Sequence, residues 1–243
     1  GISLGTEFEQ YENVSLAPSI SISHENIETD DTASSQLKKM EGTFNNLDFS
    51  YAIIADRRNQ AFQPTSGYRS KFLQSLPLIQ DSSSILNGYE LSSFHGFSED
   101  VTGAIKFYGR AIHGVDDDVR ITNRLFLPPS KLRGFDTRKV GPKDAGDWVG
   151  GNYTTALTLE ALLPNLLPES TKTDISVFID SGNVWEVDYS DSLEDSSTIR
   201  SAFGLSANVF TAIGPLTFTL AQDISKNSTD VAQVFNFRLG TSF

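Results

Sequence analysis

The pattern that decides the fold is clearest in residues 231–243, which read VAQVFNFRLGTSF. Side chains along this stretch alternate between two faces with a period of two, as in a β-strand that has one apolar face. One face carries Val231, Gln233, Phe235, Phe237, Leu239, Thr241 and Phe243. The other face carries Ala232, Val234, Asn236, Arg238, Gly240 and Ser242.

The same alternation recurs along most of the chain. In residues 173–184, Ile175, Val177 and Ile179 face one way, and Ser176, Phe178, Asp180 and Gly182 face the other. Further strands are expected at 2–9, 13–24, 47–53, 68–76, 86–97, 101–110, 152–163, 199–210 and 216–220. These make eleven strands, most of them about 9–12 residues long, which suits a tilted strand that crosses a bilayer better than the ~5–6 residues typical of soluble sheets.

The connectors between these strands give a second signal. Turns at 10–12, 98–100 and 211–213 are short, whereas the intervening loops at 25–45, 113–151 and 185–198 are long and polar or acidic. Two connectors on the short side, 57–67 and 164–172, are of medium length. An up-and-down barrel with tight turns on one side of a membrane and long loops on the other predicts this rhythm.

We therefore expect an all-β protein, an antiparallel up-and-down transmembrane β-barrel formed by residues 1–243. Its mixed polar face suits a water-filled lumen, and its aliphatic face with aromatic ends suits contact with lipid. The alternative is a soluble β-sandwich with one solvated face, which strand length and loop parity disfavour. Since a closed barrel of one bacterial chain normally has an even strand number, eleven strands predict either a part of a larger barrel that lacks an odd number of N-terminal strands or a strand count that is wrong by one.

Composition excludes several other classes of protein. The 243 residues include no Cys, which excludes a disulfide scaffold, a thiolate metal site and a Cys nucleophile. Nineteen basic and thirty-one acidic side chains give a net charge of −12, so nucleic acid is not an expected partner. The sequence contains no run of 18 or more apolar residues, so it predicts no transmembrane helix.

The most informative local sequence lies in the long loop at 113–151. It contains Leu132, Arg133, Gly134 and Phe135 in succession, followed by Val-Gly-Pro at 140–142 and Val-Gly-Gly-Asn at 149–152. A tight turn of this composition can present one guanidinium. Glu160 and Asp180 lie on the expected lumen faces of the next two strands, so a loop folded back into the lumen would bring Arg133 to them.

These residues resemble a known family. The segment LRGF with its following VGP and VGGN is similar to the lumen loop of the BamA-type outer-membrane assembly factors, also called bacterial surface antigen barrels. FIDSGNVW at 178–185 resembles the strand motif that receives the loop arginine, and TLEALLP at 158–164 resembles the strand between. The turn at 56–67, residues 199–222 and the terminal FNFRLGTSF resemble other parts of the same barrel.

The resemblance implies a C-terminal portion, the last eleven of sixteen strands, without the first strands and the periplasmic POTRA domains. Such proteins fold and insert β-barrel proteins into the outer membrane of Gram-negative bacteria, without catalysis or cofactor. Expected partners are outer-membrane lipids including lipopolysaccharide, nascent barrel clients and accessory lipoproteins.

The resemblance also assigns roles to individual residues. Arg133 would be the loop-tip arginine, and its partners on the barrel wall would be Glu160, Phe178, Asp180 and Gly182. The terminal strand would serve as seam or assembly signal through Phe235, Phe237, Leu239, Gly240 and Phe243.

Other readings of the sequence are possible. A passive pore or receptor also shows alternation and a terminal Phe, and a polypeptide translocator of the two-partner secretion type shares the motifs. Glu160 and Asp180 could form an acid–base pair, but Arg133 is the expected partner of both, and no catalytic residue is assigned. The acidic run at 116–118 lacks the spacing of a calcium loop, and His24, His95 and His113 lack zinc spacing, so no metal site is expected.

Overall fold

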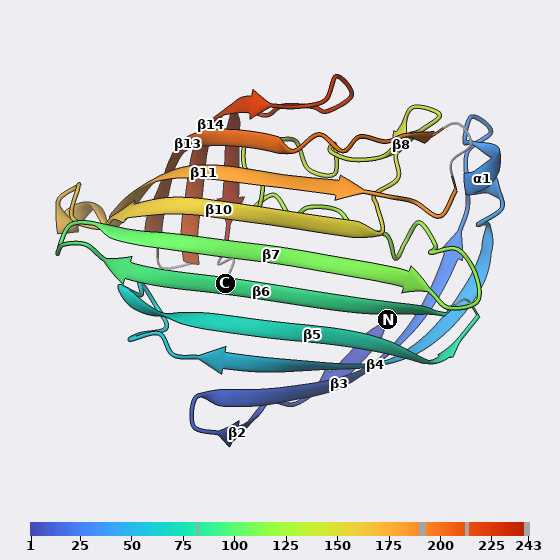
Figure 1. The fold of residues 1–243 in the computed structure, drawn as a ribbon, viewed down its shortest axis with the longest axis horizontal. Helices are drawn as coiled ribbons and strands as arrows, with labels where there is room; N and C mark the ends of the chain where they lie inside the picture. Colours follow the sequence, from blue (N-terminus) through green and yellow to red (C-terminus); the bar gives the residue numbers. More distant parts are fainter. Residues whose placement is uncertain (82, 190–192, 212–213, 241–243) are drawn as a thin grey trace.

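The computed structural model describes residues 1–81, 83–189, 193–211 and 214–240. Antiparallel strands form one large sheet in the order β1-β3-β4-β5-β6-β7-β10-β11-β13-β14-β15, and β2 also pairs with β3 (Figure 1). Its strands are β1 (Ile2–Gly5), β2 (Phe8–Tyr11), β3 (Val14–Ile27), β4 (Gly42–Asp56), β5 (Ser66–Gln80), β6 (Ser84–Gly96), β7 (Thr102–Gly114), β10 (Tyr153–Leu163), β11 (Thr173–Trp185), β13 (Arg200–Thr211), β14 (Gly214–Ser225) and β15 (Phe235–Leu239).

Small elements lie in the loops. The strands β8 (Lys143–Asp144), β9 (Asp147–Trp148) and β12 (Leu193–Glu194) form a separate three-stranded sheet. The helix α1 (Ser35–Lys38) and the 3₁₀ turn η1 (Glu169–Thr171) are a single turn each. No helix among the described residues is long and apolar enough to cross a membrane.

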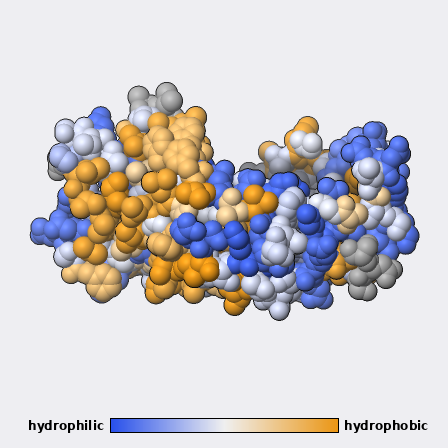
Figure 2. Space-filling model, turned by 90° about the horizontal axis from the view of Figure 1, so that it is seen from above, coloured by the Kyte–Doolittle hydropathy of each residue, from blue (hydrophilic) through white to orange (hydrophobic). Residues whose placement is uncertain are grey.

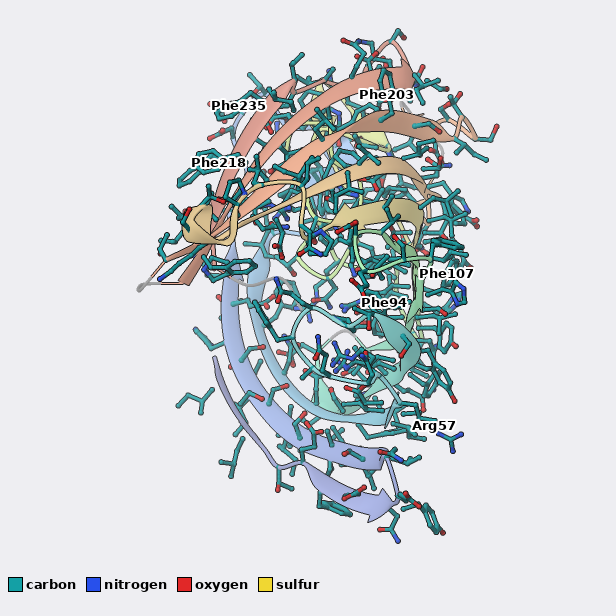
Figure 3. All side chains as sticks on the ribbon, turned by 90° about the vertical axis from the view of Figure 1, so that its left-hand side faces the viewer. Arg57, Phe94, Phe107, Phe203, Phe218 and Phe235 are labelled. Carbon is teal, nitrogen blue, oxygen red and sulfur yellow. The ribbon has the colours of Figure 1, made fainter. Side chains whose placement is uncertain are left out.

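The large sheet is an arc. One edge is the interrupted strand made of β1 and β2, both paired with β3, and the other edge is β15, paired with β14. Within the described residues no ladder joins these two edges, so the sheet is open. Seen from the turn side, the strands curve around a concave face that holds the loop between β7 and β10 (Figure 3).

The prediction of an all-β up-and-down fold is confirmed, and the strand number agrees when β1 and β2 are counted as one interrupted strand. Several strands are longer than the alternation indicated: β4 and β5 have 15 residues each. The reason is that backbone hydrogen bonds continue through polar residues beyond the apolar band. Because β5 ends at Gln80 and β6 begins at Ser84, their loop-side connector is short and breaks the expected rhythm.

The two faces of the sheet differ as the alternation predicts. On β11, Val177 and Ile179 are exposed on the convex face, whereas Ser176, Phe178 and Asp180 are buried on the concave face. Over the end of the sheet formed by β13–β15, hydrophobic residues gather in the left half of Figure 2, and the right-hand end, where Figure 1 places α1 and β8, is hydrophilic. This is the distribution expected of a lipid-facing band capped by solvated loops.

The last predicted strand is only partly correct. Phe235, Phe237 and Leu239 are exposed on the convex face as expected, but β15 begins at Phe235. Residues 231–233 leave the sheet, whereas the Val234 carbonyl oxygen still accepts a hydrogen bond from Ala221 N on β14, and the Val234 side chain is exposed although its parity matches the concave face. The physical reason is that the backbone of 231–233 finds other hydrogen-bond partners in the lumen loop, as described below. Phe243 lies outside the described residues.

Candidate functional site

The loop between β7 and β10 folds into the concave face and is anchored there by Arg133. The Arg133 backbone N–H donates to Asp180 Oδ2 at 3.0 Å, Nε donates to the same oxygen at 2.7 Å, and Nη2 donates to Oδ1 at 2.9 Å. Nη1 donates to Glu160 Oε1 at 2.9 Å. Arg133 is 8% exposed and Asp180 is fully buried, so this forked contact is shielded from water and correspondingly strong.

Phe178 provides the floor of the site. The Arg133 guanidinium lies 3.4 Å from the centroid of the Phe178 ring, within cation–π distance. The strand register explains the arrangement, because Thr158 pairs with Asp180 and Glu160 pairs with Phe178 across β10 and β11. Neighbouring strands therefore present the two carboxylates and the ring side by side on one face.

Polar side chains that the sequence analysis did not single out complete the cluster. Thr158 Oγ1 donates to Asp180 Oδ1 at 2.8 Å, and Ser176 Oγ donates to Glu160 Oε1 at 2.8 Å. Lys106 Nζ lies 2.5 Å from Glu160 Oε2. The signal that could have found them is parity, because each lies on the polar face of its strand.

The cluster is electrically balanced, with Arg133 and Lys106 facing Asp180 and Glu160. Burial disfavours the charged form of Arg133, but the hydrogen bonds and charges of Asp180 and Glu160 outweigh this and hold the pKa of Arg133 above its usual value. A saturated and neutral cluster of this kind fixes a loop in place. It presents no free base to a substrate.

The remaining residues of the motif serve close packing. Leu132 and Phe135 are buried in one apolar cluster with wall residues such as Tyr108 and Ala202. Gly134 has φ +89°, and a β-carbon there would lie 2.8 Å from Ala202 Cβ. The tight turn therefore requires glycine for both its backbone angle and its space.

Gly182, on the barrel wall, is also required for close packing. A β-carbon at this position would meet the Thr155 carbonyl oxygen at 2.8 Å and Leu127 Cδ1 at 3.1 Å. Gly240, by contrast, has φ +108° and open space around it, as in an ordinary turn after β15.

The lumen loop also binds the segment that precedes β15. Phe135 and Ala232 form an antiparallel bridge. Asp136 N donates to Val231 O at 2.8 Å, and Gln233 N donates to Gly134 O at 2.9 Å. This contact could not be predicted from the sequence, because the alternation in 231–233 is equally compatible with pairing to β14.

Within the described residues, no group of three or more His, Asp or Glu side chains is placed to hold a metal ion. The structure thus brings together Arg133, Glu160, Phe178 and Asp180. The aromatic residues of β15 lie apart, on the convex face. What each residue does in the working protein stays a prediction.

Comparisons with known proteins agree on one family. A sequence profile described as the Omp85 superfamily domain matches residues 1–243. The outer membrane protein assembly factor BamA of Neorickettsia risticii is 24% identical over 204 residues, which cover 80% of this chain and 27% of the relative. The sorting and assembly machinery component 50 homolog of Homo sapiens is 29% identical over 137 residues, covering 55% of this chain and 29% of the relative.

The fold agrees as well. A crystal structure of BamA from Haemophilus ducreyi lacking POTRA domains 1–3 superposes with a TM-score of 0.83 at 22% identity, over 97% of this chain and 52% of that chain. The chain spans less than a third of the length of the two curated relatives described above. The full-length match to the superfamily profile and the shared fold lead to one conclusion: the chain belongs to the Omp85 superfamily of outer-membrane β-barrels.

Proposed function

We propose that this chain forms barrel strands of an outer-membrane protein assembly factor, a protein that folds and inserts other β-barrel proteins into the bacterial outer membrane. The observation that carries the proposal is that Arg133, Asp180 and Glu160 hold the lumen loop against the wall. The relatives of this chain include one named as an outer membrane protein assembly factor and one named as a sorting and assembly machinery component. The proposed action is non-enzymatic and needs no cofactor, because the buried acids of the site are all engaged by cations and hydroxyl groups.

The proposed partners follow from this function. Nascent β-barrel proteins are the clients, and outer-membrane lipids, including lipopolysaccharide, surround the convex face. Accessory lipoproteins of the assembly complex would bind mainly to POTRA domains, which we propose as a further part of the full-length protein.

A passive pore is less well supported than an assembly factor. The lumen loop packs against the wall through an apolar cluster that includes Leu127, Leu132 and Phe135. A loop held in this way fills space that a wide channel leaves open.

The test is made in the full-length protein in a Gram-negative host that depends on it. We expect Arg133→Ala and Asp180→Ala each to reduce growth and the amounts of folded outer-membrane barrels, because either change frees the loop. Arg57→Ala is the matched control, since Arg57 is exposed and points away from the concave face (Figure 3). Normal growth and normal barrel amounts in both site variants would overturn the proposal, and so would a large steady conductance of the unmutated protein in planar bilayers.

A further inference from the structure

A cavity of about 670 Å³ lies on the concave face below the lumen loop. The turn-side connector at 57–65 reaches across its mouth: Phe62 packs edge-on against Phe210 with ring centroids 5.1 Å apart, and Gln63 donates a hydrogen bond to Asp174. A connector between β4 and β5 thus contacts β11 and β13 on the far side of the arc. The volume falls within the range that holds a ligand or a short peptide segment.

The charge of this cavity is opposite to that of the whole chain. Seven of its lining side chains are basic and three are acidic, although the chain carries a net charge of −12. Most of the cations share carboxylates. Glu90 forms ion pairs with both Arg110, at 3.3 Å, and Lys131, at 3.6 Å. Glu160 likewise pairs with both Lys106 and Arg133.

Two carboxylates outside the lining, Asp56 and Asp180, also pair with lining cations. Even when these two are counted, five carboxylates face seven cations. A shielded pocket with surplus positive charge attracts anions.

Arg238 is the cation without a carboxylate. It lies on the lumen face of β15, half-buried, and no ion pair or hydrogen bond involves its side chain in the part of the chain that the structure describes. The charge of Arg133 acts on it unfavourably and those of Asp180 and Glu160 favourably, but both of these carboxylates are already engaged by Arg133 and Lys106. A half-buried guanidinium that forms no ion pair of its own is where an incoming anion gains most.

Two polar neighbours extend this donor group across the sheet. Arg238 pairs in register with Thr217 on β14, and Thr217 pairs with Asn208 on β13. Thr217 Oγ1 donates to Asn208 Oδ1 at 2.8 Å, which turns the Asn208 amide so that its Nδ2 hydrogens are left to donate. All three side chains line the cavity, in a row set by the strand spacing of about 4.8 Å.

We propose that this cavity binds an acidic peptide segment, with a carboxylate on Arg238 and Asn208. A peptide fits better than a lipid chain because the wall mixes rings such as Phe62 and Phe94 with hydroxyl and amide groups such as Ser92 and Gln60. An acyl chain would leave these polar groups without partners, whereas a peptide backbone pairs with them. The site does not depend on the proposed assembly function.

The experiment uses the full-length protein in detergent micelles and a hexapeptide of alternating Asp and Phe that carries an uncharged fluorophore. Fluorescence anisotropy measures its binding, and the Asn–Phe hexapeptide is the uncharged isostere. We expect Arg238→Gln to weaken binding of the acidic peptide by roughly tenfold, as loss of one charge-assisted hydrogen-bonded pair predicts. The Asn–Phe peptide, which lacks all three carboxylates, should bind at least roughly tenfold more weakly.

Matched variants make the test specific. Arg57→Gln removes an arginine of the same charge outside the cavity and should leave affinity unchanged, and Arg238→Lys should keep most of it. Equal affinity for the Asp–Phe and Asn–Phe peptides, or equal losses in Arg238→Gln and Arg57→Gln, would overturn the proposal. Displacement of the peptide by inorganic phosphate at constant ionic strength would reveal a simple ion site instead, and displacement by vesicles of anionic lipid would reveal a membrane contact. Because binding is measured without any client, failure here leaves the assembly proposal standing.

Discussion

The ring of Phe178 covers Gly204, its partner in the β11–β13 ladder, so closely that a β-carbon on residue 204 would lie 2.8 Å from Phe178 Cζ. The Arg133 guanidinium lies over the same ring. The height of the arginine above the sheet is therefore set by the missing side chain at residue 204. A glycine that carries no chemistry of its own positions the charged contact.

This relationship predicts the effect of Gly204→Ala. The added methyl would meet Phe178 and the Leu220 carbonyl oxygen, so ring and strand must shift, at an expected cost of about 1–3 kcal/mol. We expect a lower midpoint in the heat-induced gel-mobility shift of the full-length protein. Gly88→Ala is the control, because its methyl would make only ordinary contacts, at 3.5 Å or more. Equal midpoints for the two variants would contradict the prediction.

Asp180→Asn should detach the lumen loop. The substitution leaves the buried Arg133 with Glu160 as its carboxylate partner, and breaking a buried pair costs about 3–5 kcal/mol. Limited proteolysis should then cut the loop faster.

Asp174→Asn is the comparison for this prediction, since it changes the same residue type on the same strand where the structure shows one amide contact, from Gln63. If the loop of Asp180→Asn resists protease as well as that of Asp174→Asn, the anchoring role is wrong.

A pair of cysteines can test the unexpected contact of residues 231–233 with the lumen loop. Because residues 1–243 contain no Cys, Phe135→Cys with Ala232→Cys gives a single possible disulfide within them. Residues directly opposite in an antiparallel bridge lie within disulfide reach, so we expect rapid crosslinking on mild oxidation, seen as a non-reducing gel shift. The comparison pair is Asp223→Cys with Ala232→Cys, which would meet only if β15 ran straight on along β14. Crosslinking of this second pair in preference to the first would contradict the structure.

Asp230→Asn should loosen the approach to β15. Asp230 accepts from Arg200 Nε at 2.8 Å and Nη2 at 3.1 Å, and both side chains are fully buried. The change leaves a buried guanidinium without its carboxylate, so amide hydrogen exchange in 226–234 should become faster. Asp223→Asn breaks the more exposed pair with Lys226 near the same loop and should have little effect. Similar exchange rates in the two variants would argue against a role for the buried pair.

The sequence predicted most of the sheet because alternation is a local property. The face on which a side chain lies can be read from its immediate neighbours in the sequence. The structure places four such residues on the expected convex face: Val177, Ile179, Phe235 and Phe237. Strand ends were less predictable, since backbone pairing in β4 and β5 continues where the apolar pattern stops. The meeting of Arg133 with Asp180 could be anticipated from the motif and from the order of the strands.

Competition between distant partners could not be predicted from local pattern. Residues 231–233 can pair equally well with β14 or with a loop about a hundred residues earlier, and only the folded loop decides which. That Arg238 forms no ion pair was equally unpredictable, because it depends on which cations take the carboxylates of other strands.

The attachment of residues 231–233 to the lumen loop has a mechanical consequence. Asp180 binds Arg133, and the residues after Arg133 bind the segment that leads into the last strand. Tension applied at the sheet's edge is therefore shared between the β14–β15 ladder and a second route, which ends at a carboxylate three strands inward. Peeling the last strand away has to break both.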